Sequence, residues 1–197
     1  MSTMPHEPAT GFPRALRAAF LDRDGVLNEK MSEIAYVRTA ADFHPLPGVA
    51  ESIARLNRAG LLVLVVTNQR GIALGLYTLA DVAAIHESFQ QYLANFGAHI
   101  DGFFVCPHDK NECNCRKPLP GLFEQAAARF PQLTPSTSVM IGDSLGDIEF
   151  GRRLGMTTVY LPGSAEHRSP TAEAASAVAG HRFESLPEAV DALLAPL

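Results

Sequence analysis

Five short apolar runs alternate with segments of helical periodicity, and this alternation restricts the fold more than any other feature of the chain. Each run is long enough for a buried strand and leads into polar residues; the runs span 15–21, 61–66, 102–105, 138–142 and 157–161. Strands that alternate with helices are joined by right-handed crossovers, which produces a parallel sheet covered on both faces. The sequence therefore predicts a doubly wound, mostly parallel α/β sheet.

Helix signals fill the intervals between these runs. A Ser-x-x-Glu capping box at Ser185 and Glu188 opens a last helix that ends near Leu194 and covers the sheet. The segment 163–180 is small and polar, so we expect a mobile surface stretch there. The other helices are predicted over 47–59, after the N-cap Thr78, after Pro120, and from about Ser144 to the residue before Gly155.

The 197 residues suffice for one well-packed domain, which we expect over 14–197 after a disordered segment at 1–13. The formal net charge of −5 provides no basic surface for a nucleic acid. The chain contains no apolar stretch of the roughly 18 residues that span a bilayer, and its polar start has no signal-peptide core. We therefore expect a cytoplasmic protein, monomeric, with neither nucleic acid nor membrane as a partner.

The polar residues that follow the apolar runs are expected to meet at one site. In an open parallel sheet, ligands bind beyond the carboxyl ends of the strands. Those ends are followed by acids, a hydroxyl, an amide and a thiol, namely Asp22, Asp24, Thr67, Asn68, Cys106 and Asp143. The sequence thus predicts a polar site at this edge of the sheet.

Two carboxylates at one strand end, joined by Asp143, would raise each other's pKa unless a cation lay among them. Magnesium suits such a site because it prefers oxygen ligands and keeps several waters for a substrate phosphate to replace. Asp22 is placed to act as a nucleophile and Asp24 as an acid and base, with Gly25 allowing the sharp turn. The alternative is a loop whose acids only cap a helix.

Three further motifs favour phosphoryl chemistry. In "VVTNQRG", Thr67 and the backbone amides after it offer a phosphate cradle, although an ordinary strand-to-helix cap has the same residues. "CRKP" supplies Arg116 and Lys117, and a fixed lysine neutralises charge in phosphoryl transfer, although a solvated turn is the alternative. "IGDSLGDIE" places Asp143 and Asp147 on one face of a helix start.

The three cysteines of the chain and one histidine lie within ten residues, in "CPHDKNECNC". Three thiolates and an imidazole can close a tetrahedral zinc site with no open position, which is the hallmark of a structural metal. Buried free thiols beside a surface histidine are the alternative, and the polar residues between them disfavour it. The predicted ligands of this zinc-stabilised loop are Cys106, His108, Cys113 and Cys115.

These motifs together resemble the haloacid dehalogenase superfamily of phosphohydrolases, over about residues 17–162. "DRDG", "TNQRGIALG", "CPH...CNCRKP" and "IGDSLGD" resemble its zinc-loop branch, the histidinol-phosphate and heptose-bisphosphate phosphatases. The resemblance implies a Rossmann-like sheet without a large cap domain, with short loops around the site: 27–46, the stretch after Gln69, and the zinc loop.

The resemblance also implies a role for each matching residue. Asp22 is the nucleophile that forms an aspartyl-phosphate, Asp24 is the general acid and base, and the Mg²⁺ ligands are Asp22, the Asp24 carbonyl and Asp143. Asp147 lies behind them. The residues implied to hold the phosphoryl group are Thr67 and Lys117, and those implied to bind the rest of the substrate are Asn68, Gln69, Arg70 and Arg116.

The implied substrate is a small phosphorylated metabolite of carbohydrate metabolism. "AYVRTAADFHPLPGV" and "TNQRGIALGLYT" resemble the D-glycero-D-manno-heptose 1,7-bisphosphate 7-phosphatases more than the histidinol-phosphate phosphatases, which remain the alternative. Arg70 and Arg38 are candidates to meet a second phosphate with a planar guanidinium. A receiver-type phosphoacceptor domain and a catalytically silent zinc module are the remote alternatives.

Overall fold

The computed structural model describes residues 12–13, 16–31, 36–163 and 169–195. Within them a six-stranded sheet has the order β3-β2-β1-β4-β5-β6, and every pair of neighbouring strands is parallel. The strands are β1 (Ala18–Leu21), β2 (Leu62–Asn68), β3 (Gly102–Cys106), β4 (Ser138–Gly142), β5 (Thr157–Tyr160) and β6 (His181–Arg182). The predicted doubly wound sheet is confirmed, and the strand order reverses between β1 and β4, where such folds bind ligands.

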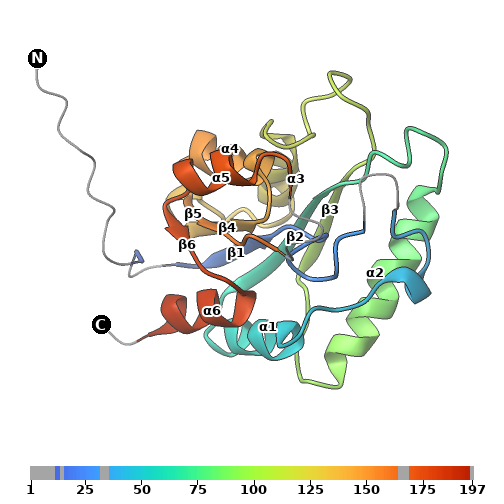
Figure 1. The fold of residues 1–197 in the computed structure, drawn as a ribbon. Helices are drawn as coiled ribbons and strands as arrows, with labels where there is room; N and C mark the ends of the chain where they lie inside the picture. Colours follow the sequence, from blue (N-terminus) through green and yellow to red (C-terminus); the bar gives the residue numbers. More distant parts are fainter. Residues whose placement is uncertain (1–11, 14–15, 32–35, 164–168, 196–197) are drawn as a thin grey trace, which may run out of the picture.

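Helices cover both faces of the sheet (Figure 1). One face carries α1 (Val49–Arg58), α2 (Leu79–Ala94) and α6 (Leu186–Leu194), and α6 lies beside α1. The opposite face carries α3 (Gly121–Arg129), α4 (Leu145–Leu154) and α5 (Ala172–Val178). Two short 3₁₀ helices, η1 (Ala40–Asp42) and η2 (Pro135–Thr137), complete the described elements, which include no large cap.

The central strand β1 explains why its sequence is apolar at every position. Side chains alternate between faces along a strand, so Ala19 and Leu21 contact the α1 side while Ala18 and Phe20 contact the α3 side. All four side chains are fully buried, because both faces of a parallel sheet are covered. This burial holds β1 in a single register against β2 and β4.

The helix starts follow the predicted caps with one difference. The Thr78 hydroxyl accepts from the Asp81 amide, and the Asp81 carboxylate accepts from the Thr78 amide, which is a reciprocal box. Ser185 accepts from the Glu188 amide as predicted, but the Glu188 carboxylate accepts from the amide of Glu184. The second half of the predicted box at α6 is therefore displaced by one residue.

The prediction of a mobile stretch at 163–180 was wrong for part of that segment. Residues 172–178 form α5, and Ala175 is fully buried in a cluster with Ile148 and Tyr160. Small alanine side chains let this helix approach α4 closely, so the segment packs without an apolar stripe. Residues 164–168 lie outside the described part of the chain.

The segment 1–13, predicted to be disordered, lies outside the described residues except for Phe12 and Pro13. The Phe12 ring stacks on His181, with 4.1 Å between the ring centroids. Among the helices that the structure describes, none combines the length and the apolar character needed to cross a lipid bilayer.

His86 on α2 makes stability sensitive to acid. It is 6% exposed and stacks on Phe103, and burial together with the charge of Arg23 lowers its pKa to about 3. Below pH 6.5 the unfolded chain therefore binds a proton on His86 that the folded chain does not bind. The contribution of His86 to the free energy of unfolding is therefore fully present above pH 6.5 and is lost as the pH falls below it. We expect denaturant titrations at pH 7 and pH 5 to show a loss of about 2 kcal/mol from this group. His86→Phe should retain the stacking on Phe103 and lose about 2 kcal/mol less stability than the wild type between pH 7 and pH 5. Equal pH sensitivity of the wild type and the variant would contradict the role given to His86.

Candidate active site

The turn after β1 brings two carboxylates to the edge of the sheet. Asp22 continues the strand, since its amide donates to the Ile141 carbonyl at 3.0 Å. Gly25 then turns the chain with φ +95°, a conformation that side chains disfavour. A Cβ at this position would lie 2.6 Å from the Oδ2 of Asp143. Glycine is thus required both by the turn and by the close approach of β4.

The strand ends enclose a cavity of about 280 Å³. It lies beyond β1, β2 and β4, at the reversal of strand order. Most of the predicted site residues line it: Asp22, Asp24, Thr67, Asn68, Gln69, Arg116, Lys117, Asp143 and Asp147. The arrangement expected from the sheet edge is therefore present, except that Cys106 is not among the described residues that line this cavity.

Lys117 is the more buried of the two lysines that line this cavity. Its ammonium group donates to Asp22 Oδ1 at 2.8 Å, to the Val66 carbonyl at 2.6 Å and pairs with Asp147 Oδ1 at 2.5 Å. Burial alone would lower the pKa of Lys117, but the charges of Asp147 and Asp22 outweigh it and raise the pKa above its usual value. The ammonium therefore stays charged at neutral pH.

Asn68 fixes the backbone of Lys117. The Asn68 amide oxygen accepts from the Lys117 amide at 3.0 Å, and its nitrogen donates to the Lys117 carbonyl at 3.2 Å. The side chain predicted to bind substrate thus joins β2 to the loop that carries the lysine.

The buried acids lack full charge compensation. Burial and the Asp147 charge raise the pKa of Asp22 to about 7 against the lowering effect of Lys117. Burial raises the pKa of Asp143 to about 6, although Lys30 opposes the shift through a contact of 2.5 Å with Asp143 Oδ2. Asp143 Oδ1 is buried and has no hydrogen-bond partner among the described residues. Such a carboxylate set favours a bound cation.

A magnesium ion fits the donor atoms at this point. One oxygen each of Asp22, Asp143 and Asp147 lies within 4.8 Å of the others. Hard divalent cations take such carboxylate oxygens, and the orphaned oxygen of Asp143 would gain a partner. Asp147 is already engaged by Lys117 and by the amide and hydroxyl of Ser144, at 3.1 and 2.6 Å. Asp22 and Asp143 are therefore the side chains best placed to hold the ion.

Asp24 faces a different set of partners. Its carboxylate accepts from Arg23 at 2.9 Å, from Asn28 at 3.0 Å and from Gln69 at 3.0 Å. Burial would raise the pKa of Asp24, but Arg23 and these hydrogen bonds lower it below its usual value. The resting form of Asp24 is thus an oriented carboxylate, which is able to accept a proton.

The three arginines that were expected near substrate have different positions. Arg116 lines the cavity, and its Nη1 lies 3.4 Å from the His108 carbonyl. Arg70 instead forms a two-pronged ion pair with Asp109, at 2.5 and 3.0 Å, and is not among the described residues that line the cavity. Arg38 is exposed and is not among the lining residues, although its neighbour Val37 is.

Sequence reasoning missed several polar residues of the site. Arg23 is 1% exposed, and its position between two strand-end acids was a usable signal. Lys30 contacts Asp143 although the two residues are 113 positions apart in the chain, and no local sequence pattern predicts such a contact. Tyr77 donates to Gln69 at 2.7 Å, and only the fold places it there.

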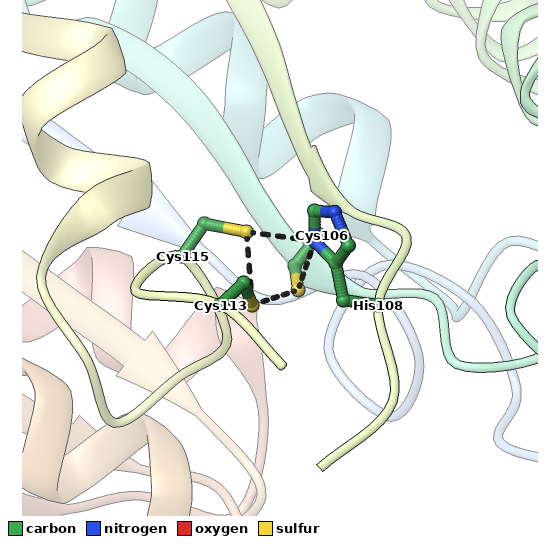
Figure 2. A group of neighbouring side chains, drawn as sticks. All are labelled: Cys106, His108, Cys113 and Cys115. Atoms are coloured by element: carbon green, nitrogen blue, oxygen red, sulfur yellow. Dashed lines mark hydrogen bonds between the residues drawn. The ribbon is translucent and has the colours of Figure 1, made fainter. Parts of the chain in front are cut away.

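The predicted zinc ligands form one cluster at the end of β3 (Figure 2). Cys113 Sγ lies 3.6 Å from Cys106 Sγ and 3.3 Å from Cys115 Sγ, and His108 Nδ1 lies 3.3 Å from Cys115 Sγ. Ligand atoms of a tetrahedral zinc site are about 3 to 4 Å apart, so the donors and their spacing fit zinc. The cluster precedes Arg116 directly and thereby ties the Lys117 loop to β3.

Cys113 has the thiol most ready to bind a metal. Burial raises its pKa, but hydrogen bonds from Cys115 and from the backbone amides of Arg116 and Cys115 outweigh that effect and lower the pKa to about 7. The thiolate, which is the metal-binding form, is therefore accessible near neutral pH.

The chain is similar to several known proteins. The D-glycero-alpha-D-manno-heptose-1,7-bisphosphate 7-phosphatase of Mycobacterium tuberculosis (strain ATCC 25618 / H37Rv) is 43% identical over 136 residues, covering 68% of this chain and 71% of that protein. The corresponding beta-anomer phosphatase of Vibrio cholerae is 34% identical over 178 residues, covering 86% and 94%. The crystal structure of D,D-heptose 1.7-bisphosphate phosphatase from B. bronchiseptica, complexed with magnesium and phosphate, superposes with a TM-score of 0.79 at 32% identity, covering 91% and 98%.

A model of haloacid dehalogenase-like hydrolases matches residues 10–155, which is most of the chain and includes the acids and both lysines that line the cavity. The resemblance read from the motifs is confirmed by this match and by the relatives above. The chain belongs to the haloacid dehalogenase-like hydrolase family.

Proposed function

We propose that the protein is a magnesium-dependent phosphatase that releases the 7-phosphate of D-glycero-D-manno-heptose 1,7-bisphosphate through an aspartyl-phosphate on Asp22. The observation that supports it most is the contact of Asp22 with Lys117 at 2.8 Å inside the cavity at the strand reversal. This pair holds a nucleophile against a permanent positive charge. The substrate assignment follows the relatives that act on this bisphosphate.

The reaction has two phosphoryl transfers, first to Asp22 and then to water, and both use the carboxylates of Asp22 and Asp24. A carboxylate oxygen of Asp22 forms a bond to phosphorus as the bond between phosphorus and the sugar oxygen breaks. Asp24, which takes up a proton when the anionic phosphoryl group binds beside it, gives that proton to the sugar oxygen. Asp24 then removes a proton from a water molecule that attacks the phosphorus. The acyl-phosphate bond breaks, phosphate leaves, and Asp22 is free again.

The other residues stabilise the charge that moves during these steps. Lys117 neutralises the phosphoryl oxygens, and the Thr67 hydroxyl, which is buried at the end of β2, donates to one of them. Asp22, Asp143 and the Asp24 carbonyl would hold a magnesium ion, which would supply further positive charge to stabilise the transition state. Cys106, His108, Cys113 and Cys115 would hold a zinc ion, which would keep the loop before Lys117 in place.

The test is phosphate release from a panel of substrates in the presence of magnesium. The panel holds both anomers of the heptose 1,7-bisphosphate, histidinol phosphate and simple sugar phosphates. We expect kcat/KM for one heptose anomer to exceed the rest by about a hundredfold, near 3 kcal/mol of discrimination. Preference for histidinol phosphate would move the protein to the sister branch with the same chemistry, and no hydrolysis at all would refute the enzyme itself.

We further infer a cytoplasmic monomer as the working form. The three cysteines are free thiols, and a reducing compartment keeps them available to zinc. Gel filtration of the zinc-loaded protein tests the monomer directly.

A further inference from the structure

The side-chain amide of Gln69 makes every hydrogen bond available to it. Nε2 donates to Asp24 Oδ2 at 3.0 Å and to Thr67 Oγ1 at 2.8 Å, and Oε1 accepts from Arg23 Nη2 at 3.1 Å and from Tyr77 OH at 2.7 Å. A primary amide has two N–H donors and two lone pairs, so these four contacts exhaust it. Although Gln69 lines the cavity, its amide has no group left to offer a substrate.

The partners also determine which way the amide points. Arg23 can only donate, so it requires the oxygen of Gln69 on its side. The Asp24 carboxylate can only accept, so it requires the nitrogen on the other side. Gln69 is 2% exposed and Arg23 1%, which keeps water from replacing either contact. A flipped amide would face repulsion at both ends, so one orientation is specified.

The backbone supports the same arrangement. The Gln69 amide N–H donates to the Cys106 carbonyl at the end of β3, at 2.8 Å. Tyr77 reaches Gln69 because position 71 is glycine, where a Cβ would lie 2.2 Å from the tyrosine ring. The loop between Gln69 and Tyr77 thus closes back on its own first residue, and Gly71 makes that closure possible.

We propose that Gln69 is a positioning residue that holds the carboxylate of Asp24 in register with the hydroxyl of Thr67, and not a substrate contact. This inference rests on the proposed function, because it assigns Asp24 the proton transfers and Thr67 the phosphoryl group. Asp24 follows β1 and Thr67 is the last residue but one of β2, and in the described structure no other group joins these two side chains directly. Gln69 couples the proton-transfer group to the phosphoryl site.

The test is Gln69→Met, which keeps the length of the side chain and removes all four hydrogen bonds. We expect kcat to fall about a hundredfold, because a misplaced catalytic group costs that much, while KM changes by no more than about threefold. The water attack depends on Asp24, so phosphoenzyme trapped by acid quench during turnover should rise above the wild-type fraction. A loss of structure alone would not produce this combination of a lower kcat, a nearly constant KM and a higher phosphoenzyme fraction.

The matched control is Gln90→Met. Gln90 is a half-buried glutamine on α2 whose amide bonds both backbone groups of Ile100, at 3.1 and 3.0 Å, away from the cavity. It should lose stability with kcat unchanged. If Gln69→Met proves unstable, Gln69→Glu and Tyr77→Phe replace it: the former keeps the acceptors for Arg23 and Tyr77 but repels Asp24, and should lower kcat far more than the latter.

The outcomes separate this inference from the proposed function. If the wild-type protein hydrolyses nothing on the panel, the proposed function fails. If the wild type turns over and Gln69→Met raises KM about a hundredfold with kcat unchanged, Gln69 contacts substrate and the inference is overturned. It is also overturned if kcat and the phosphoenzyme fraction both stay at wild-type values.

Discussion

Replacing Asp22 by asparagine is expected to lower kcat by about four orders of magnitude or more, since the amide oxygen cannot attack phosphorus. Asparagine nearly matches aspartate in volume, so the turn after β1 and the contact with the Ile141 carbonyl should survive. Lys117 would keep its partners Asp147 and the Val66 carbonyl. The measurement is single-turnover phosphate release, with circular dichroism to verify the fold.

The control for this variant is Asp191→Asn, which removes an acid whose side chain is 65% exposed and pairs with Arg55 on α1. It should turn over at the wild-type rate, because a surface ion pair contributes little and lies far from the cavity. Activity of Asp22→Asn within tenfold of the wild type, in a folded protein, would remove Asp22 from its role as nucleophile.

Cys113→Ser is expected to have the largest effect on stability. Cys113 contacts the sulfur atoms of both other cysteines, and serine is a poor zinc ligand. Since the free energy of zinc binding is also folding free energy for the loop, the melting temperature should fall by about 10 °C or more. Metal analysis should show one zinc per wild-type chain and less than that in the variant.

The effect of Cys113→Ser on catalysis should pass through the loop alone. Lys117 lies two residues after Cys115, so kcat should fall, while magnesium affinity stays within a few-fold because Asp22 and Asp143 follow other strands. His99→Asn, at an exposed histidine outside the cluster, is the control and should retain zinc. A wild-type protein without zinc, or a variant with unchanged zinc, would contradict a structural metal here.

Much of the fold follows from local pattern. Burial of both faces makes most positions of β1, β2 and β4 apolar, and a polar residue ends each apolar run, namely Asp22, Thr67 and Asp143. The observed β2 runs on through Thr67 and Asn68, because β3 offers partners at Val105 and Cys106. The helix α5 was missed because its packing depends on small side chains, which carry no periodic apolar signal.

The site was predictable where chemistry is local and not where it depends on distant partners. Asp22, Lys117 and Asp143 could be placed because each directly follows a strand or a loop signal. Arg70 could not, since its partner Asp109 lies 39 residues away and an arginine motif does not reveal which anion it pairs with. Gln69 lies in the predicted place, but only its four contacts show that its amide is occupied.

Because β1 is short and central, catalytic activity depends on whether this strand has folded in the correct register. β1 pairs Phe20 with Leu64 on one side and with Met140 on the other, and so joins the two halves of the sheet. A slip by one residue would move every β1 side chain to the opposite face and put Arg23 where Asp22 belongs. A chain in which β1 had the wrong register could remain compact yet release no phosphate. The rate at which turnover returns during refolding would therefore measure how fast β1 joins the two halves of the sheet.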